Sequence, residues 1–259
     1  MPSTLQLEFA GEIATITLNR PEKRNAISAA MIGDLLGAFA EAEANPARVV
    51  ILTGAGKAFC AGMDLDALKA LATQSPTEHL EDSRRTARLY RRIWSFPKPT
   101  IAAVNGAAVA GGCGLATLCD FTIAAPEAKF GYPEVRIGFI PAIVSVFLTR
   151  QIGEKRARDL LLSGKIIDAA EALSLGLVNE IAPAAGLMDA AHRVAKDLLA
   201  SSPVSLFKTK KLLRDSAAPE LDRELELAIA ESAQMRSTED FREGLAAFLE
   251  KRAPRWKAK

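Results

Sequence analysis

Two glycine-bearing segments, residues 57–65 and 105–114, have compositions suited to chemistry performed by the backbone. Each follows a short apolar run, and the second leads into a helical stretch around residues 115–119. Backbone N–H groups in a loop or at the N-terminus of a helix lack partners in the chain and attract negative charge. Two such donors that converge on one oxygen form an oxyanion hole, and small residues beside them let a ligand approach. Close packing of a strand on a helix favours the same residues, so composition alone leaves both interpretations open.

Side-chain motifs of the common catalytic classes are missing from the sequence. No G-x-S-x-G motif occurs, and the two histidines, His79 and His192, lie in polar helical sequence that predicts solvent-exposed imidazoles. Residues 53–58 lack the first glycine and the Ser/Thr of a phosphate-binding loop, and residues 111–114 lack the spacing of a dinucleotide-binding motif. We expect no metal site either. The candidates that remain are reactions that need few side chains.

Strands and helices alternate in the first half of the chain. Residues 5–9 and 13–18 predict a β-hairpin, and residues 49–52, 101–104 and 121–124 predict buried strands. Ser28 precedes an amphipathic helix, and residues 76–96 predict a basic helix. After Pro141 the pattern is almost wholly helical, with breaks expected at Gly153, Gly164, Gly176, Pro203 and Pro219. The order of elements therefore predicts an α/β core followed by a helical C-terminal region.

Composition excludes several other classes of protein. The 259 residues are 49% hydrophobic and carry a net charge of +2, which argues against disorder and against a general affinity for nucleic acid. The three cysteines form no C-x-x-C pair, which favours buried thiols in a reducing compartment. Residues 100–119 carry no charge, but their glycines favour a strand, a turn and a helix over a membrane span. No secretory signal is visible at the N-terminus, so we expect a cytoplasmic protein that does not bind membranes.

Sequence patterns along nearly the whole chain resemble one known family. They are Asn19-Arg20-Pro21 with Asn25-Ala26, residues 50–65, residues 98–120, Phe130-Gly131-Tyr132-Pro133-Glu134 with Gly138 and Pro141, residues 153–157, and residues 243–252. In these patterns the sequence resembles the crotonase superfamily, also called the enoyl-CoA hydratase/isomerase superfamily. The resemblance implies an α/β fold, a crotonase-like spiral of ββα units with a helical C-terminal trimerisation region. It implies a spiral core over residues 1–195, a helical region over residues 196–259, and assembly as a homotrimer or a dimer of trimers.

The resemblance also assigns roles to particular positions. The oxyanion donors would be the backbone N–H groups of Met63 and Gly111, and Glu134 would be the catalytic carboxylate. Binding of the acyl-CoA thioester would fall to Lys23, Arg24, Ala26, Ala61, Gly62, Asp64, Leu65 and Gly114, with Phe248 and Lys251 of the last helix covering the nucleotide. No cofactor is expected, because coenzyme A is part of the substrate. For Glu134 a surface or capping role is the alternative, and for Phe248 and Lys251 ordinary packing and solvation.

The sequence departs from the best-known relatives at two places. Hydratases typically carry a first glutamate three residues after the second oxyanion donor, and here that position is Gly114. We expect the glycine to leave an open space opposite Glu134 for water, an anion or a larger acyl group. Residues 141–146 are bulkier and more apolar than their counterparts, which predicts a reshaped acyl pocket.

The resemblance implies an enzyme that stabilises a thioester enolate. Reversible hydration of a 2-enoyl-CoA is the first interpretation, with one carboxylate activating water and returning a proton to the α-carbon. A double-bond isomerase that uses Glu134 alone is the second. A non-catalytic acyl-CoA-binding or RNA-binding protein is the third, since residues 84–92 contain five arginines. Retention of Glu134 favours catalysis over this last alternative.

Overall fold

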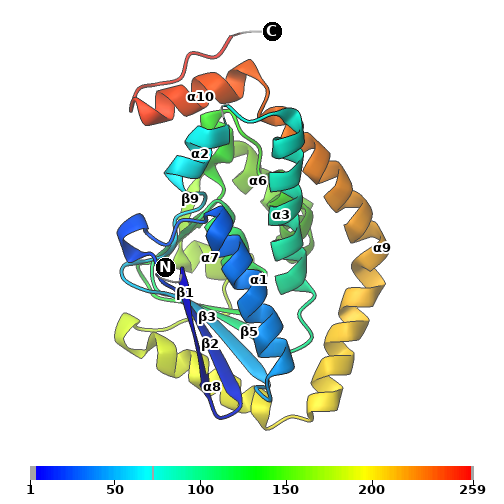
Figure 1. Cartoon of the computed structure of the whole chain (residues 1–259). Coiled ribbons are helices and arrows are strands. Elements are labelled where there is room, and N and C mark those ends of the chain that lie inside the picture. Colours follow the sequence, from blue (N-terminus) through cyan, green and yellow to red (C-terminus); the bar gives the residue numbers. More distant parts are fainter. Residues whose placement is uncertain (1–3, 72, 258–259) are drawn as a thin grey trace.

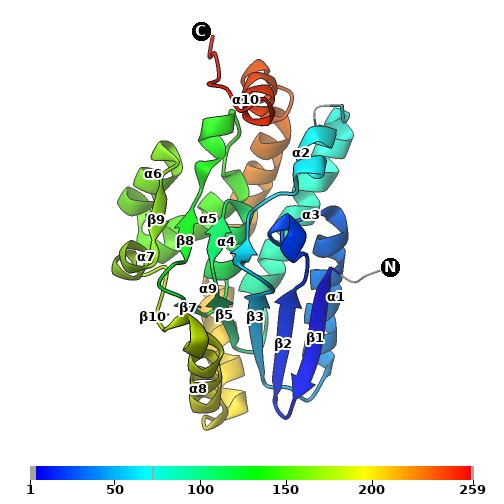
Figure 2. The same cartoon turned by 90° about the vertical axis from the view of Figure 1, so that its left-hand side faces the viewer.

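The protein is described by a computed structural model that covers residues 4–71 and 73–257. Two β-sheets form its centre (Figures 1 and 2). The first sheet has the order β1-β2-β3-β5-β7-β10, and the second has the order β4-β6-β8-β9. The strands of the first sheet are β1 (Leu5–Ala10), β2 (Ile13–Leu18), β3 (Val49–Gly54), β5 (Thr100–Val104), β7 (Phe121–Ala124) and β10 (Glu180–Ile181). Those of the second are β4 (Ala58–Cys60), β6 (Ala107–Val109), β8 (Lys129–Gly131) and β9 (Ile166–Asp168).

A repeated connection links the two sheets. β3 leads to β4, β5 to β6, and β7 to β8, so the first strand of each pair lies in one sheet and the second strand in the other. A helical segment follows each pair: α2 (Leu65–Leu71) and α3 (Pro76–Trp94) after β4, α4 (Gly111–Thr117) after β6, and η2 (Pro133–Ile137) with α5 (Ala142–Ile152) after β8. This is the predicted succession of ββα units. The candidate site residues Met63, Gly111 and Glu134 therefore all follow strands of the second sheet.

Helices cover both faces of the first sheet because its central strands are apolar on both. In β3, Val50 and Leu52 face a core that includes α1 (Ala29–Ala44) and α3. Val49 and Ile51 face α8 (Leu187–Leu199) on the other side. The uncharged segment of residues 100–119 is buried here as β5, β6 and α4, which confirms the prediction of a strand, a turn and a helix. Within the described residues no helix is both long and apolar enough to span a membrane.

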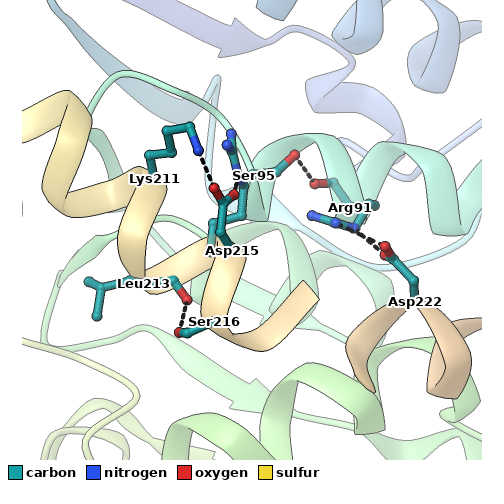
Figure 3. A network of polar contacts seen from close by, with 8 residues as sticks. Arg91, Ser95, Lys211, Leu213, Asp215, Ser216 and Asp222 are labelled. Atoms are coloured by element: carbon teal, nitrogen blue, oxygen red, sulfur yellow. Dashed lines mark hydrogen bonds and ion pairs between the residues drawn. The ribbon is translucent and has the colours of Figure 1, made fainter. Parts of the chain in front are cut away.

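The remaining helices complete the C-terminal half. They are η1 (Pro21–Lys23), α6 (Glu154–Ser163), α7 (Ala169–Leu175), η3 (Ala184–Gly186), α9 (Pro203–Met235) and α10 (Glu239–Leu249). α9 runs along α3, and α10 packs on η2 at one end of the molecule (Figure 1). Arg91 of α3 joins Asp222 of α9 in a two-point ion pair with its Nε 2.7 Å from one carboxylate oxygen (Figure 3). Arg84 and Arg92 pair with Glu81 and Glu43, so ion pairs within the chain engage three of the five arginines of this basic helix.

One sequence prediction about the C-terminal half is wrong. Pro219 does not break the helix but lies inside α9. The side chain is exposed, so the carbonyl that loses its helical partner can bond to water. The predicted boundary between residues 195 and 196 cuts α8, because that helix packs on the sheet through Ala195 and, further along, Leu198. The helical region of α9 and α10 therefore begins after α8.

Candidate active site

The residues 61–64, called here the Met63 loop, leave one backbone donor free. The loop pairs with Ile27, whose N–H donates to the Gly62 carbonyl over 2.7 Å and whose carbonyl accepts from Asp64 over 2.9 Å. The N–H of Met63 lies between these two bonds and donates to no acceptor in the part of the chain that the structure describes. It has the properties of the predicted first oxyanion donor.

Polar contacts with residues 20–25 hold the Met63 loop in place. A guanidinium nitrogen of Arg20 lies 2.7 Å from a carboxylate oxygen of the buried Asp64. Burial raises the pKa of Asp64, but the hydrogen bonds from Arg20 and the Asp66 N–H outweigh it, so the pKa is lowered overall. The buried Asn25 side chain donates to the carbonyls of Ala55 and Ala58 over 2.9 and 2.8 Å. The ion pair thus fixes this loop directly, and Asn25 holds the segment that leads into β4 just before it.

Residues 109–112, called here the Gly111 turn, bring the second donor beside the first. β6 pairs with β4, so the turn and the Met63 loop lie side by side, and a Cβ atom on Gly62 would be 3.8 Å from the Gly111 nitrogen. Gly112 packs directly on β4, because a Cβ there would lie 2.1 Å from the Cys60 carbonyl oxygen. Within residues 4–71 and 73–257 the N–H of Gly111 has no acceptor, as expected at the first residue of α4.

Glu134 lies in η2, directly after β8. β8 pairs with β6 on the side away from β4, and the Ala110 N–H donates to the Gly131 carbonyl over 2.8 Å. The Oε2 atom of Glu134 is buried and has no hydrogen-bond partner among the described residues. Burial raises the pKa of this carboxyl from its ordinary 4.5 to about 7. A half-buried carboxyl with an orphaned oxygen and a pKa near neutrality is suited to proton transfer.

Gly114 does not leave an open space, contrary to the expectation from the sequence. A Cβ atom there would lie 2.9 Å from Val144 and 3.2 Å from the ring of Tyr90. These two side chains occupy the position where a glutamate side chain would begin. The apolar segment 141–146 does reach the site, through Val144 of α5.

The residues assigned to coenzyme A binding fall into two groups. Lys23, Arg24 and Ala26 lie beside the Met63 loop, because the Ala61 N–H donates to the Arg24 carbonyl over 3.0 Å. The first group comprises Lys23, Arg24, Ala26, Ala61, Gly62, Asp64 and Leu65. Asp64 is buried and pairs with Arg20, so it holds the loop and does not face solvent. The second group is Phe248, 52% exposed at the end of α10, and the exposed Lys251 that follows it. α10 packs on η2 of the same chain, which places this group on the Glu134 side.

Sequence reasoning missed three positioning side chains and misjudged one. Arg20 and Asn25 belong to the sequence patterns that resemble the family. A basic and an amide residue there, together with the acidic Asp64 of the Met63 loop, were the features that could have predicted a contact between the two segments. Tyr90 carried only a weak signal, an aromatic residue in a basic helix. His79, predicted at the surface, is buried, and its Nε2 lies 2.8 Å from the Leu71 carbonyl oxygen. The three cysteines are buried as predicted, and burial raises the pKa of each thiol to about 12.

Comparisons with known proteins identify the family of the chain and agree with its fold. Residues 8–259 match the family described as Enoyl-CoA hydratase/isomerase. A Thermus thermophilus protein named "Putative enoyl-CoA hydratase" is 46% identical over 247 residues, which are 95% of this chain and 98% of the relative. A "Short-chain-enoyl-CoA hydratase" of Clostridium acetobutylicum is 35% identical, over 95% of this chain and 94% of its own. The crystal structure of an enoyl-CoA hydratase/isomerase from Xanthobacter autotrophicus superposes with a TM-score of 0.89 at 34% identity, covering 99% of both chains.

Proposed function

The chain belongs to the enoyl-CoA hydratase/isomerase family, and we propose that it catalyses the reversible hydration of a 2-enoyl-CoA thioester. One observation carries the proposal: a buried, unpartnered carboxylate oxygen of Glu134 on a turn beside two free N–H groups. The N–H groups of Met63 and Gly111 would polarise the thioester carbonyl, which makes the β-carbon electrophilic and stabilises the enolate that forms. No further cofactor enters this chemistry.

Glu134 would serve as base and acid in turn. It takes a proton from water as the oxygen adds to the β-carbon, and it returns that proton to the α-carbon of the enolate. Its pKa of about 7 lets both protonation states exist near neutral pH. The net result is the addition of one water molecule across the double bond, with Glu134 restored.

A double-bond shift is the second candidate, because Gly114 leaves the site without a second carboxylate. Tyr90 and Val144 fill that position. Moving a proton between two carbons of an enoyl thioester needs only one base, which Glu134 supplies. A hydratase with one carboxylate must also hold its water without help from position 114.

A thioester panel tests the two candidates together. Short, branched and aromatic enoyl-CoA thioesters are incubated with the protein, and the products are separated into hydrated and isomerised forms. Glu134→Gln keeps the shape of the side chain and should lower turnover by roughly 10²–10⁴. Glu127→Gln, an exposed glutamate without a described ion pair, is the matched control and should keep wild-type turnover. Full turnover by a folded Glu134→Gln protein would end the assignment.

We also propose that the chain assembles as a homotrimer or a dimer of trimers. α9 exposes five large apolar side chains to solvent, which a single chain leaves uncovered: Val204, Phe207, Leu212, Leu213 and Leu227. Light scattering after size-exclusion chromatography gives the oligomer mass directly. The location we propose is the cytoplasm, since three free buried thiols fit a reducing compartment.

A further inference from the structure

Tyr90 makes direct contact with the second oxyanion donor. It projects from α3, is 2% exposed, and its hydroxyl donates to the Gly111 carbonyl oxygen over 2.8 Å. The fit is close, since a Cβ atom on Gly111 would lie 2.7 Å from that hydroxyl oxygen. Burial raises the pKa of Tyr90 well above its usual value, so the hydroxyl keeps its proton and remains a donor.

The two peptide groups that flank Gly111 are held by different partners. The carbonyl of Ala110 accepts from the N–H groups of Cys113 and Gly114 over 3.0 and 3.2 Å. Ala110 itself has φ 52° and ψ −126°, a conformation that is strained for an alanine and persists only where neighbours impose it. The next peptide, with the Gly111 carbonyl, is the one that Tyr90 holds. The Gly111 N–H belongs to the first of these peptides, so a shift of the second peptide would reach it by rotation about the Gly111 backbone bonds, which glycine permits.

α3 is rigidly placed for this task. Arg91, next to Tyr90, is tied to Asp222 of α9, as Figure 3 shows. Arg92 bonds to Glu43 of α1 over 2.5 Å. The helices on both sides of α3 thus hold the position of the Tyr90 hydroxyl relative to Gly111.

We propose that Tyr90 is a positioning residue, whose hydroxyl fixes the Gly111–Gly112 peptide and so limits rotation at Gly111, which keeps the N–H of the preceding Ala110–Gly111 peptide directed at the thioester oxygen. This rests on the proposed function, because it presumes that an enolate forms in the site. Tyr90 acts through Gly111 and also closes the space beside Gly114. The bond from the α3 tyrosine thereby contributes to how strongly one of the two donors stabilises the enolate.

Tyr90→Phe removes the bond and keeps the ring, so it is the first test. We expect kcat to fall roughly tenfold, below the 10²–10³ that follows loss of a whole donor, with KM within about twofold. Tyr132→Phe is the matched control, because Tyr132 is equally buried and its hydroxyl bonds to Thr117 rather than to the Gly111 turn. Both variants should lose a similar few degrees of Tm, about 2–4 °C for one bond. Only Tyr90→Phe should lose kcat.

A binding measurement separates this inference from the proposed function. Acetoacetyl-CoA forms an enolate that absorbs in the near ultraviolet, so its pKa on the protein can be titrated without turnover. Tyr90→Phe should raise that pKa by about one unit, equivalent to a tenfold weaker hold on the enolate. If wild-type protein turns over no enoyl-CoA yet this shift appears, the proposed function fails and the role of Tyr90 stands. An unchanged titration with unchanged kcat in folded Tyr90→Phe overturns the role.

Gly111→Ala, alone and combined with Tyr90→Phe, gives an independent test of the same contact. The substitution keeps the N–H but sets a methyl group against the Tyr90 hydroxyl. We expect it to lose kcat in the wild-type background and to regain at least fivefold in the Gly111→Ala/Tyr90→Phe double variant, where the hydroxyl is gone. Full kcat in Gly111→Ala alone, or strictly additive losses in the double variant, would show that the two residues do not act together.

Discussion

The Met63 loop and the Gly111 turn each offer a backbone N–H without an acceptor among the described residues, but different forces hold them. The ion pair of Arg20 with Asp64 fixes the Met63 loop, and Asn25 holds residues 55 and 58, just before it, through amide hydrogen bonds. The Gly111 turn is fixed by close packing of Gly112 on β4 and by one bond from Tyr90. The Met63 loop should therefore respond to changes of charge and pH, and the Gly111 turn to added atoms.

The largest effect is expected from an added methyl group in the Gly111 turn. Gly112→Ala would force a Cβ to 2.1 Å from a backbone carbonyl that cannot move aside. We expect a loss of about 3 kcal/mol in stability and, from displacement of the neighbouring donor, about 10² in turnover. Urea unfolding and steady-state kinetics measure both. Gly37→Ala, in open space on α1, is the control and should be neutral or stabilising; equal behaviour of the two variants would mean that packing does not hold the turn.

A charge deletion should affect the Met63 loop in the same assays, but less. Arg20→Ala leaves Asp64 buried without its partner. Removing one partner of a fully buried ion pair costs about 3–5 kcal/mol of stability. The Arg20 side chain is 19% exposed, so we expect Arg20→Ala to lose about 2 kcal/mol of stability and about tenfold in turnover. The bond between Ile27 and Gly62 keeps part of the loop in place. Arg158→Ala breaks an exposed pair and should change stability by less than about 0.5 kcal/mol. If Arg20→Ala lost no more stability than Arg158→Ala, the comparison would be contradicted.

The smallest effects are opposite pH dependences of two acidic side chains. The pKa of Asp64 is lowered in the folded state, so its stabilising effect is fully present above about pH 4 and is lost as the pH falls below about 4 through the lowered pKa. The pKa of Glu134 is raised to about 7, so the folded state loses stability as the pH rises from about 4.5 through 7. Glu134→Gln should accordingly be about 1 kcal/mol more stable than wild type at pH 8, and Asp64→Asn less stable than wild type at pH 7. Both differences in stability should shrink toward zero in acid. Measuring Tm as a function of pH for each variant tests this. A Glu134→Gln protein less stable than wild type at pH 8 would show that burial does not raise the pKa of Glu134.

The long elements were predictable because their patterns are local. The hairpin of residues 5–18, the helix after Ser28 and the strands at residues 49, 101 and 121 follow from alternation, capping and apolar runs. β4, β6, β8 and β9 have three residues each, too few for a period to show, so the second sheet was recognisable only through family resemblance. Pro219 was misread because solvent exposure, which a local pattern does not give, decides whether a helix tolerates it.

The resemblance assigns the donors and Glu134, but their surroundings depend on distant segments. Gly114 predicted empty space because the sequence does not reveal that Tyr90 and Val144 meet there. His79 looked polar because its neighbours are, yet the fold buries it under the end of α2. The motif identifies the groups that act. Contacts between residues far apart in sequence decide how those groups are held.

The packing of α10 on η2 has a consequence for the order in which the protein is made. Phe241 of α10 lies against Phe139, and the same cluster contacts the side chain of Met63. Ribosomes deliver the chain from its N-terminus, so the Met63 loop and η2 emerge well before the helix that covers them. During that interval the apolar surface of the cluster is open to water and to other nascent chains. Docking of α10 is the step that covers this surface.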